Sequence, residues 1–393
     1  MRCFTDLAGV YAGAIASGIK PKGLDLSYIY VPEAVGCVGV FTQNKSAASS
    51  VFYTKKCLDR GVMKAIVIHS GNANACTGEQ GRKDTNQIGK IVAKRLGLTQ
   101  KQVGVAGTGI IGVYLPMERI CLGLDRLLQR IDQQEGFDVS RAILTTDLIE
   151  KSNFFEEKIG KKQIVVSGIT KGSGMFAPDM ATTLSFLVTN ASLTSSQLSP
   201  FVQHAVDRSF NMSSVDTDTS TNDMLICFST GQYRFSLSDT EQKQQFQGLI
   251  DRACLDLSSQ IVRDGEGATK FISVTVKGAV SDIDARLIAK SIVNSPLVKT
   301  AIHGEDSNWG RIMMAAGKPK GIHFNPDKVS LFFGRYCLLD CGDFQQAGYA
   351  SIRSYLKAKD IDIVLDLHLG TFSSTAYGCD LSKGYIDINT DYN

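Results

Sequence analysis

The segment Lys171–Thr183, which reads KGSGMFAPDMATT, constrains this chain more than any other stretch. It places two glycines, a proline and a small alanine ahead of two adjacent threonines. The apolar run 184–188 follows at once and predicts a buried strand. The pattern therefore favours a fold in which a Gly/Pro turn brings a threonine to the mouth of a strand.

A threonine in that place can act as a self-processing nucleophile. If the bond between Ala181 and Thr182 is cut, Thr182 gains a free α-amine beside its own hydroxyl. An α-amine has a pKa of about 7.7–8.0, so near neutral pH it can act as general base for that hydroxyl. The structural alternative is a plain strand, because β-branched threonines are common there.

A second glycine-rich stretch, VGVAGTGIIG at residues 103–112, predicts a strand that runs into a turn. Glycines in such a turn let backbone N–H groups point inward, where they can stabilise an oxyanion. A phosphate-binding P-loop is excluded because no Gly-Lys-Ser/Thr follows, and a plain turn remains the alternative.

Charged residues near these segments suit an amino-acid substrate. Lys171 lies eleven positions before Thr182 and could bind an α-carboxylate, although a lysine that opens a loop is often simply solvated. Glu266, between two glycines, is expected to be exposed on a flexible turn, where it could bind an ammonium group or remain a solvated acid. Thr145–Asp147 (TTD) is a helix N-cap signal by itself.

The first segment resembles the processing site of the ornithine acetyltransferase family, also called the glutamate N-acetyltransferase or ArgJ family. The family pattern K-G-x-G-M-x-x-P-x-M-A-T is matched at Lys171, Gly172, Gly174, Met175, Pro178, Met180, Ala181 and Thr182. Further motifs follow in the family's order across nearly the whole chain: SGNANACTGEQG at 70–81, TGIIGVYLPM at 108–117, TTD at 145–147, VDTDTSTND at 215–223, DGEGATK at 264–270, NWGRI at 308–312 and AYGCDL at 376–381. Many motifs in register indicate membership far more strongly than one short pattern does.

The resemblance implies roles for individual residues. It makes Thr182 the nucleophile and Ala181–Thr182 the cleavage site. It assigns the oxyanion to the Thr108 hydroxyl and the Gly109 backbone N–H. The residues that it implies for substrate binding are Thr146, Lys171, Thr182, Glu266 and Asn389.

The implied reaction is acetyl transfer in arginine biosynthesis, from N2-acetyl-L-ornithine to L-glutamate, through an acetyl-Thr182 ester and without a cofactor. Some family members also accept acetyl-CoA, and no residue decides whether this chain does. Residues 1–181 and 182–393 would form interlocked α and β chains of one core, assembled as a heterotetramer of two of each. The alternatives are a self-processed aminopeptidase or amidohydrolase of related fold, and a non-catalytic amino-acid-binding relative.

The chain departs from the family pattern at several positions. Thr217 replaces a glycine, Ser307 a proline and Tyr377 a tryptophan. The family's last binding residue, a Ser or Thr near the C-terminus, has no counterpart after Tyr392. None of these departures touches the nucleophile or the oxyanion pair.

Composition narrows the classes of partner. A net charge of +3 over 393 residues argues against nucleic acid or an anionic membrane as partner, and no apolar run approaches the roughly 18 residues of a membrane span. The N-terminal segment lacks a secretory pattern, so a cytoplasmic location is expected. Ten cysteines and five histidines never cluster at ligand spacing, so we expect no metal site.

Strand-like and helix-like segments alternate, which predicts an α/β or α+β fold. The strand predictions are 65–69, 163–166, 182–188, 271–276, 329–333 and 361–369. The helix predictions are 85–96, with Asp84 as N-cap and Gly97 as stop, and 241–261. The family resemblance adds a layered α-β-β-α sandwich of two stacked sheets with a smaller C-terminal α/β portion.

Overall fold

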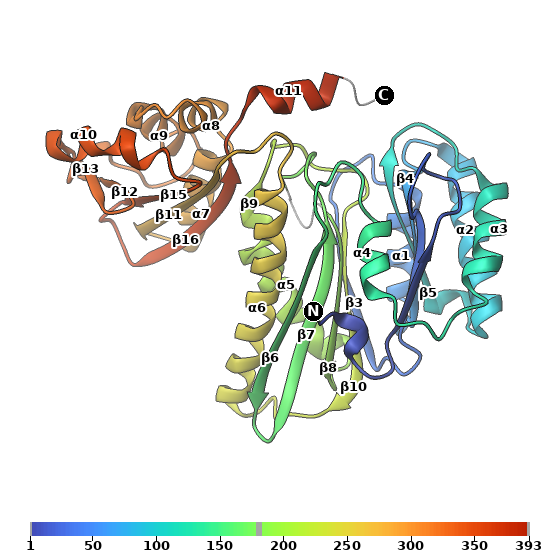
Figure 1. The fold of residues 1–393 in the computed structure, drawn as a ribbon. Coiled ribbons are helices and arrows are strands. Elements are labelled where there is room, and N and C mark those ends of the chain that lie inside the picture. The colour runs from blue at the N-terminus through green and yellow to red at the C-terminus, as the bar shows by residue number, and fades with distance from the viewer. Residues whose placement is uncertain (1, 178–182, 391–393) are drawn as a thin grey trace. The chain divides into compact units, whose positions relative to one another are not determined.

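A computed structural model describes residues 2–177 and 183–390 of the chain (Figure 1). These residues form two compact units. Unit 1 takes residues 2–172, 183–211 and 219–258, and unit 2 takes residues 173–177, 212–218 and 259–390. The substrate-site candidates divide between them, because Thr108, Gly109, Thr146 and Lys171 belong to unit 1 while Glu266 and Asn389 belong to unit 2. Each unit is therefore described by itself.

Unit 1 is built on two sheets. The four-stranded sheet has the order β1 (Tyr11–Ile15), β2 (Leu26–Tyr30), β4 (Ala65–Asn72) and β5 (Val103–Ile110). The five-stranded sheet has the order β3 (Gly36–Phe41), β10 (Met224–Tyr233), β8 (Leu184–Ala191), β7 (Lys162–Lys171) and β6 (Lys151–Ile159).

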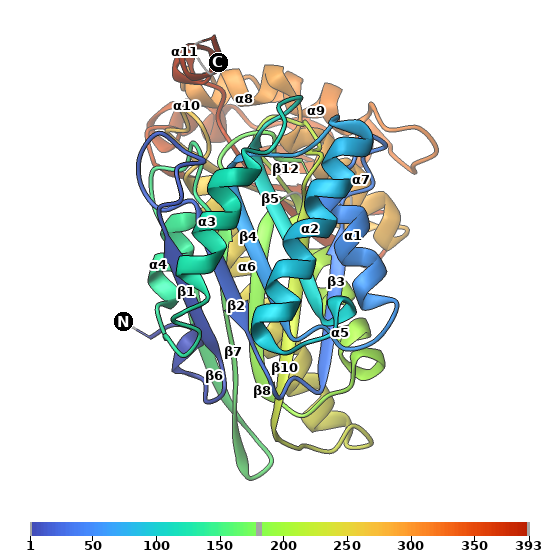
Figure 2. The same ribbon diagram turned by 90° about the vertical axis from the view of Figure 1, so that its right-hand side faces the viewer.

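Helices cover the outer faces of this pair of sheets, as the predicted α-β-β-α sandwich requires (Figures 1 and 2). On the four-stranded sheet, Val67 and Val105 pack against Ile88 of α2 (Gly78–Leu96) and Leu124 of α3 (Met117–Leu127). Helices α5 (Ser195–Arg208) and α6 (Thr240–Arg263) lie along the five-stranded sheet. The prediction of this layered fold is confirmed.

The space between the sheets is a second apolar core. Ile66 and Ile68 of β4 face Phe186 of β8 and Ile226 of β10 within one buried cluster. Burying an aliphatic or aromatic side chain of this size contributes about 1.5–3 kcal/mol each. Because β4 is buried on both faces, its sequence AIVIH is continuously apolar and does not alternate. Short helices α1 (Ser49–Leu58) and α4 (Gly136–Ala142) contribute further buried side chains to this core.

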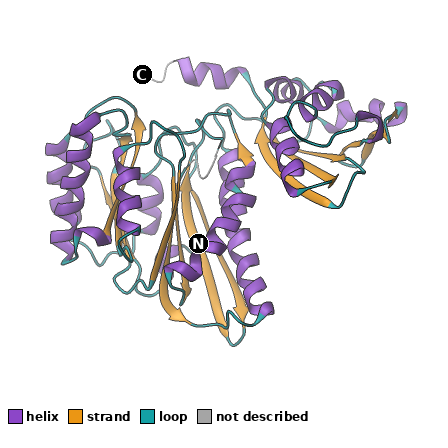
Figure 3. Cartoon of the chain, turned by 180° about the vertical axis from the view of Figure 1, so that it is seen from behind, coloured by secondary structure: helices purple, strands orange, loops and turns teal. Residues whose placement is uncertain are grey.

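Unit 2 is built on one seven-stranded sheet. Its order is β14 (Asp343–Phe344), β13 (Tyr336–Asp340), β12 (Ser330–Phe333), β15 (Asp360–Asp366), β11 (Phe271–Ala279), β16 (Phe372–Cys379) and β9 (Ser213–Ser214). Its helices are α7 (Asp282–Val293), α8 (Pro296–His303), α9 (Trp309–Ala316), α10 (Gln346–Tyr355) and α11 (Lys383–Thr390). Figure 3 separates these helices from the strands by colour.

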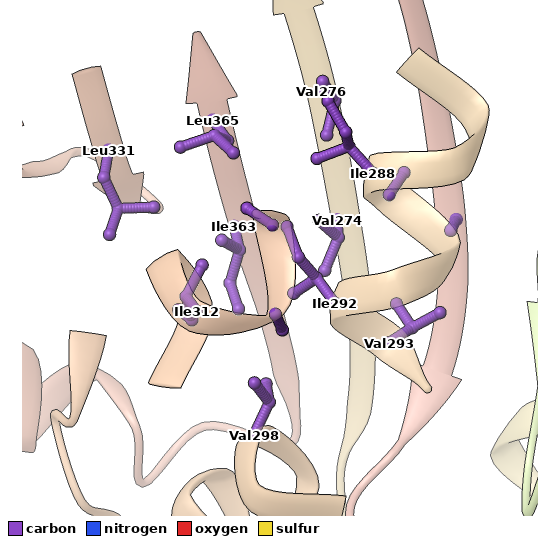
Figure 4. Close-up of a cluster of buried hydrophobic side chains, with 14 of the residues drawn as sticks. Val274, Val276, Ile288, Ile292, Val293, Val298, Ile312, Leu331, Ile363 and Leu365 are labelled. Atoms are coloured by element: carbon purple, nitrogen blue, oxygen red, sulfur yellow. The ribbon is translucent and has the colours of Figure 1, made fainter. Parts of the chain in front are cut away.

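One face of that sheet carries the core of unit 2. Val274 and Val276 of β11 and Ile363 of β15 lie against Ile288 and Ile292 of α7 (Figure 4). Strand β15 has alternate buried and exposed residues, as its near-perfect alternation of apolar and polar side chains predicts.

The predicted start of α2 is wrong. The helix begins at Gly78, not after an Asp84 cap, and Asp84 lies buried inside it and accepts a hydrogen bond from the Gln80 side chain at 2.7 Å. The first turns of α2 are mostly polar, so hydrophobic spacing misses them. The predicted stop is confirmed, because Gly97 caps the helix with a left-handed φ of +65°.

Strands from both sides of position 181 share the five-stranded sheet. Strand β8, which follows that position, pairs with β7, which precedes it, from Lys171–Leu184 to Val166–Thr189. On its other edge β8 pairs in parallel with β10. The predicted strand 182–188 is observed from Leu184 onward, and its first residue lies outside the described residues.

Candidate active site

The oxyanion candidates lie at the end of β5, where the strand leaves the core. Thr108 is 6% exposed, whereas Ile110 is 44% exposed, so the surface is reached within two residues. Strand β5 pairs in parallel with β4, and Thr108 and Gly109 lie opposite Ser70 and Gly71, next to a bulge at Asn72. A bulge at a strand end is a common way to re-aim backbone groups.

Gly109 is required by both its conformation and its surroundings. Its φ is +128°, a value that glycine adopts and other residues rarely do. A Cβ atom there would lie 2.3 Å from the Gly71 carbonyl carbon and 2.5 Å from the Asn72 nitrogen. The β4 and β5 backbones thus approach each other with no side chain between them.

Two asparagines hold this end of the sheet. The Asn72 amide donates to the carbonyls of Val113 and Tyr114, at 3.2 and 3.1 Å, and so fixes the loop that follows β5. The buried Asn222 amide donates to the carbonyls of Ala73 and Gly107, at 2.7 and 2.8 Å. The sequence motifs contained both asparagines, but only the contacts over long sequence separations reveal these roles.

The same short stretch connects the end of β5 with the start of β8. Two residues after Asn222, the Met224 N–H donates to the Thr183 carbonyl at 2.8 Å. Residues 222–224 therefore hold both Gly107, next to Thr108, and Thr183, next to position 182. Thr182 and Ala181 themselves lie outside the described residues.

The second threonine of the pair is committed to the core. Thr183 is buried, and its hydroxyl lies 2.5 Å from the Ser185 hydroxyl, which lies 2.7 Å from that of Thr170. These contacts between hydroxyl groups hold the Thr183 side chain in the core. Of the two threonines, Thr182 is therefore the one that remains a candidate nucleophile.

Lys171, at the end of β7, lies in a cluster of buried charges. Its ammonium donates to the Thr145 hydroxyl at 3.1 Å, and Asp147, two residues later, binds Lys151 at 2.7 Å and the Gly172 N–H at 2.6 Å. The side chains of Asp147 and Lys151 are fully buried. Burial opposes ionisation of Asp147, but the cations of Lys171 and Lys151 outweigh it and hold its pKa below the usual range.

The 145–147 segment is a loop, so the N-cap interpretation of TTD is wrong. The loop folds around Asp147, whose carboxylate also accepts the Thr145 N–H at 3.1 Å. Thr146 lies half-buried in the same loop. The structure therefore places Thr145, Thr146 and Lys171 in one neighbourhood of unit 1.

Asp223 adds a second buried carboxyl group beside Lys171. It is 3% exposed, and its Oδ2 atom has no hydrogen-bond partner. Burial raises its pKa well above the usual range, although the nearby Lys171 cation acts in the opposite direction. A buried carboxyl group of this kind favours its neutral form.

In unit 2, Glu266 is not the exposed turn acid that the sequence predicts. It is 9% exposed, and its carboxylate accepts the Asn389 amide at 2.9 Å. Its backbone N–H donates to the Ser173 carbonyl at 2.8 Å. A Cβ atom on Gly174 would lie 2.3 Å from the Glu266 carboxylate, so this glycine leaves the space that the glutamate fills. Glu266 and Asn389, 123 residues apart, are thus brought together.

Asp216 holds the backbone at Met175 and Phe176. It accepts the N–H groups of Met175 and Phe176, and the Tyr385 hydroxyl lies 3.4 Å away. Burial raises the pKa of Asp216, and the backbone hydrogen bonds partly offset that effect. Thr217, which stands where the family has glycine, keeps the left-handed φ of +71°.

Within residues 2–177 and 183–390, no three His, Cys, Asp or Glu side chains are grouped to hold a metal ion. None of the helices that the structure describes is long and apolar enough to cross a membrane. Every cysteine of the chain is a free thiol. His69 is buried beside Gly107, and burial lowers its pKa to about 4, so its ring is neutral near pH 7.

The sequence of this chain is similar to those of known proteins over nearly its whole length. The model of the ArgJ family matches residues 11–393. Two relatives called arginine biosynthesis bifunctional protein ArgJ are similar over nearly their whole length. The one from Gloeobacter violaceus is 41% identical and covers 99% of this chain and 97% of its own, and the one from Bacillus cereus is 39% identical and covers 98% and 95%.

One crystal structure is also similar. It is that of the bifunctional ArgJ protein of Bacillus halodurans, which is 38% identical with a TM-score of 0.51. The match covers 53% of this chain and 98% of that chain. The crystallised chain thus corresponds to about half of the present one.

Proposed function

This chain belongs to the ArgJ family of arginine-biosynthesis acetyltransferases, and from that premise we propose how its residues carry the acetyl group. Thr182 takes the acetyl group from N2-acetyl-L-ornithine as an ester and passes it to L-glutamate. The observation that carries this proposal is the connection through residues 222–224, which hold both Gly107 and Thr183. It supports a place for Thr182 beside the end of β5.

Self-cleavage between Ala181 and Thr182 prepares the nucleophile. The Thr182 hydroxyl attacks the Ala181 carbonyl, and the peptide C–N bond breaks, which frees the α-amine and leaves an ester. Water then hydrolyses this ester to the Ala181 carboxylate and the free Thr182 hydroxyl, and the α-amine serves as general base. Residues 1–181 become the α chain and 182–393 the β chain. The pairing of β8 with β7 supports chains that stay interlocked after the cut. The match of a crystallised family member to about half of this chain also supports cleavage.

The transfer then proceeds in two half-reactions. The Thr182 hydroxyl attacks the acetyl carbonyl while its α-amine accepts the proton. The Thr108 hydroxyl and the Gly109 N–H donate to the oxyanion, and ornithine leaves with the proton returned to its amine. Glutamate attacks the acetyl ester in the same way and leaves as N-acetylglutamate. The scheme needs no cofactor.

Charged groups select the substrates. Lys171 binds the α-carboxylate that ornithine and glutamate share. Thr146 assists it from the neighbouring loop, where Thr145 accepts the hydrogen bond of the Lys171 ammonium. The Glu266 carboxylate binds the side-chain ammonium of ornithine. The Asn389 amide orients the Glu266 carboxylate by donating to it at 2.9 Å. We also propose an assembly of two α and two β chains, located in the cytoplasm.

The test is acetyl transfer from N-acetylornithine to labelled glutamate, together with N-terminal sequencing of the purified protein. We expect a β chain that begins at Thr182 and labelled N-acetylglutamate as product. Thr182→Ala should remain uncut and inactive, whereas Thr183→Ala, which removes the neighbouring structural hydroxyl, should still be cut and active. An active single chain would refute the nucleophile assignment.

The same assay separates the alternatives. Release of free acetate in place of acetylglutamate would indicate an amidohydrolase, and binding of ornithine without turnover would indicate a non-catalytic relative. The relatives' names call them bifunctional. A second run with acetyl-CoA as the only donor therefore decides whether this chain also has the amino-acid N-acetyltransferase activity.

A further inference from the structure

The turn that follows β1 is organised by one buried carboxylate. Asp25 accepts the backbone N–H groups of Ser17, Gly18, Ile19 and Lys20 at 2.6 to 3.0 Å. It also accepts the Ser17 hydroxyl at 2.8 Å. Hydrogen bonds to a charged acceptor are stronger than neutral ones, so this turn is held in one conformation. The backbone of Lys20 is fixed by it.

From this turn the Lys20 side chain reaches the end of α4 and the loop that follows it, residues 143–147. Its ammonium donates to the carbonyls of Ala142 and Leu144 at 3.2 and 3.1 Å. The next residue, Thr145, receives the hydrogen bond of the Lys171 ammonium. Two cations from distant parts of the sequence therefore contact adjacent residues of one loop.

Lys20 also lies against the oxyanion end of the sheet. A Cβ atom on Gly71 would lie 2.7 Å from the Lys20 Cγ atom. Gly71 is the strand partner of Gly109. The Lys20 stem thus passes next to the residue that faces the oxyanion glycine, while its head reaches the loop that holds Thr146.

Several charged groups gather around this loop. Lys20, Lys151 and Lys171 bring ammonium groups, and Asp25 and Asp147 bring carboxylates. Burial lowers the pKa of Lys20, Asp25 counteracts that effect, and the Lys171 cation lowers the pKa further.

We propose that Lys20 is a second substrate-binding cation, which joins Lys171 in binding the α-carboxylate common to N-acetylornithine and glutamate. An ammonium group has three N–H donors. Two of them go to the Ala142 and Leu144 carbonyls, which leaves one for a carboxylate oxygen. The half-buried position of Lys20 keeps that donor within reach of a ligand. This inference rests on the proposed function, since it assigns a contact within the same site.

The competing explanation is that Lys20 only supports the loop through the two carbonyls. Lys20→Gln separates the two, because the amide keeps two N–H donors for the carbonyls and removes the charge. The measurement is kcat/KM for glutamate divided by kcat/KM for its α-amide, a neutral acceptor, with N-acetylornithine as donor. We expect this ratio to fall roughly ten- to a hundredfold, the range of one charge-assisted hydrogen bond. Equal losses for both acceptors would overturn the proposal.

Lys22→Gln is the matched control, because Lys22 is an exposed lysine two residues away in the same turn. Its ratio should stay within about threefold of the wild-type value. The same ratio can be measured in Lys171→Met, which leaves Lys20 intact and tests the proposal even if Lys20→Gln fails to fold. It should keep roughly a tenfold preference for the acid over the amide. Complete loss of preference in Lys171→Met would show that Lys20 contributes no contact.

The wild-type enzyme distinguishes this inference from the function on which it rests. If it transfers no acetyl group to glutamate, both fail together. If it does, but Lys20→Gln has the wild-type ratio of acid to amide, the proposed function stands and the second cation is refuted.

Discussion

Replacing Gly109 by alanine tests whether the backbone of β5 holds the oxyanion. The new Cβ atom would lie 2.3 Å from the Gly71 carbonyl carbon, whereas carbon atoms in contact are about 3.5–4.0 Å apart. The position of the Cβ atom is fixed by the backbone of β5, and the carbonyl carbon belongs to the backbone of β4. The two strands must therefore separate by roughly 1 Å or more at this point. A displacement of about 1 Å at a reacting centre can cost about 10² in rate, and loss of one oxyanion donor about 10²–10³.

The stability of the protein should fall as well. Overpacking by the new Cβ atom should lower the free energy of unfolding by about 1–3 kcal/mol. The strain of an alanine at the left-handed φ of +128° should lower it by about 1–3 kcal/mol more. We therefore expect Gly109→Ala to lower kcat by about 10²–10³ and the free energy of unfolding by about 2–6 kcal/mol. The measurements are acetyl transfer by the processed enzyme and urea denaturation.

Gly112→Ala is the matched control, because Gly112 lies three residues further along the chain, in the loop that follows β5. Gly112 also has a positive φ, +84°, but no atom lies within 4 Å of the Cβ position. It should therefore cost only about 1–2 kcal/mol of conformational strain and leave kcat near the wild-type value. The reasoning is refuted if processed Gly109→Ala keeps wild-type kcat, or if both variants lose activity equally. A folded Gly109→Ala that fails to cleave itself supports it, since cleavage passes through an equivalent oxyanion.

Two further residues, Thr108 and Asp147, can each be tested with a variant and its control. Thr108→Ala should lower kcat by about 10²–10³ with little change in KM, whereas Thr108→Ser, which keeps the hydroxyl, should retain most activity; equal losses in both would mean that the hydroxyl is not the donor. Asp147→Asn leaves the fully buried Lys151 without its countercharge and should cost about 3–5 kcal/mol in urea denaturation, whereas Glu79→Gln in the exposed pair with Arg82 should have little effect. Because the folded pKa of Asp147 is lowered, its stabilising contribution is present above the unfolded pKa near 3.9 and is lost as the pH falls through the folded pKa. The stability gap between wild type and Asp147→Asn should therefore narrow on acidification below about pH 4, and a gap that widened there would contradict the assignment.

Elements whose burial follows a simple pattern could be predicted from the sequence. The continuous apolar runs of β4 and β8 and the alternation in β15 gave the right element types, because burial on two faces or one leaves a direct trace in the sequence. Helix α6 was placed to within a few residues for the same reason. The register of the strands left no such trace. Yet that register sets Lys171 against Leu184 and Gly71 against Gly109.

The sequence predicts a candidate site as a set of residues, but it does not predict how those residues are arranged. Glu266 between two glycines suggested an exposed acid, since the local sequence cannot show that Asn389 and Gly174 enclose it. Asn222 donates to Ala73 across 149 positions, a separation that no periodicity encodes. The buried charges around Asp147 were missed because a lysine and an aspartate four residues apart usually form a solvated surface pair.

At Thr217 the fold accommodates a residue that departs from the family pattern, which has glycine at this position. A threonine with a φ of +71° is strained, by an amount on the order of 1–2 kcal/mol. Such strain persists only where the surroundings fix the backbone on both sides. Here Asp216 binds the N–H groups of Met175 and Phe176, and the Asp218 carbonyl accepts the N–H of Ala177 at 2.9 Å. The hydrogen bonds that hold residues 175–177, directly ahead of the proposed cleavage segment, therefore also keep Thr217 in the conformation that glycine would adopt without strain.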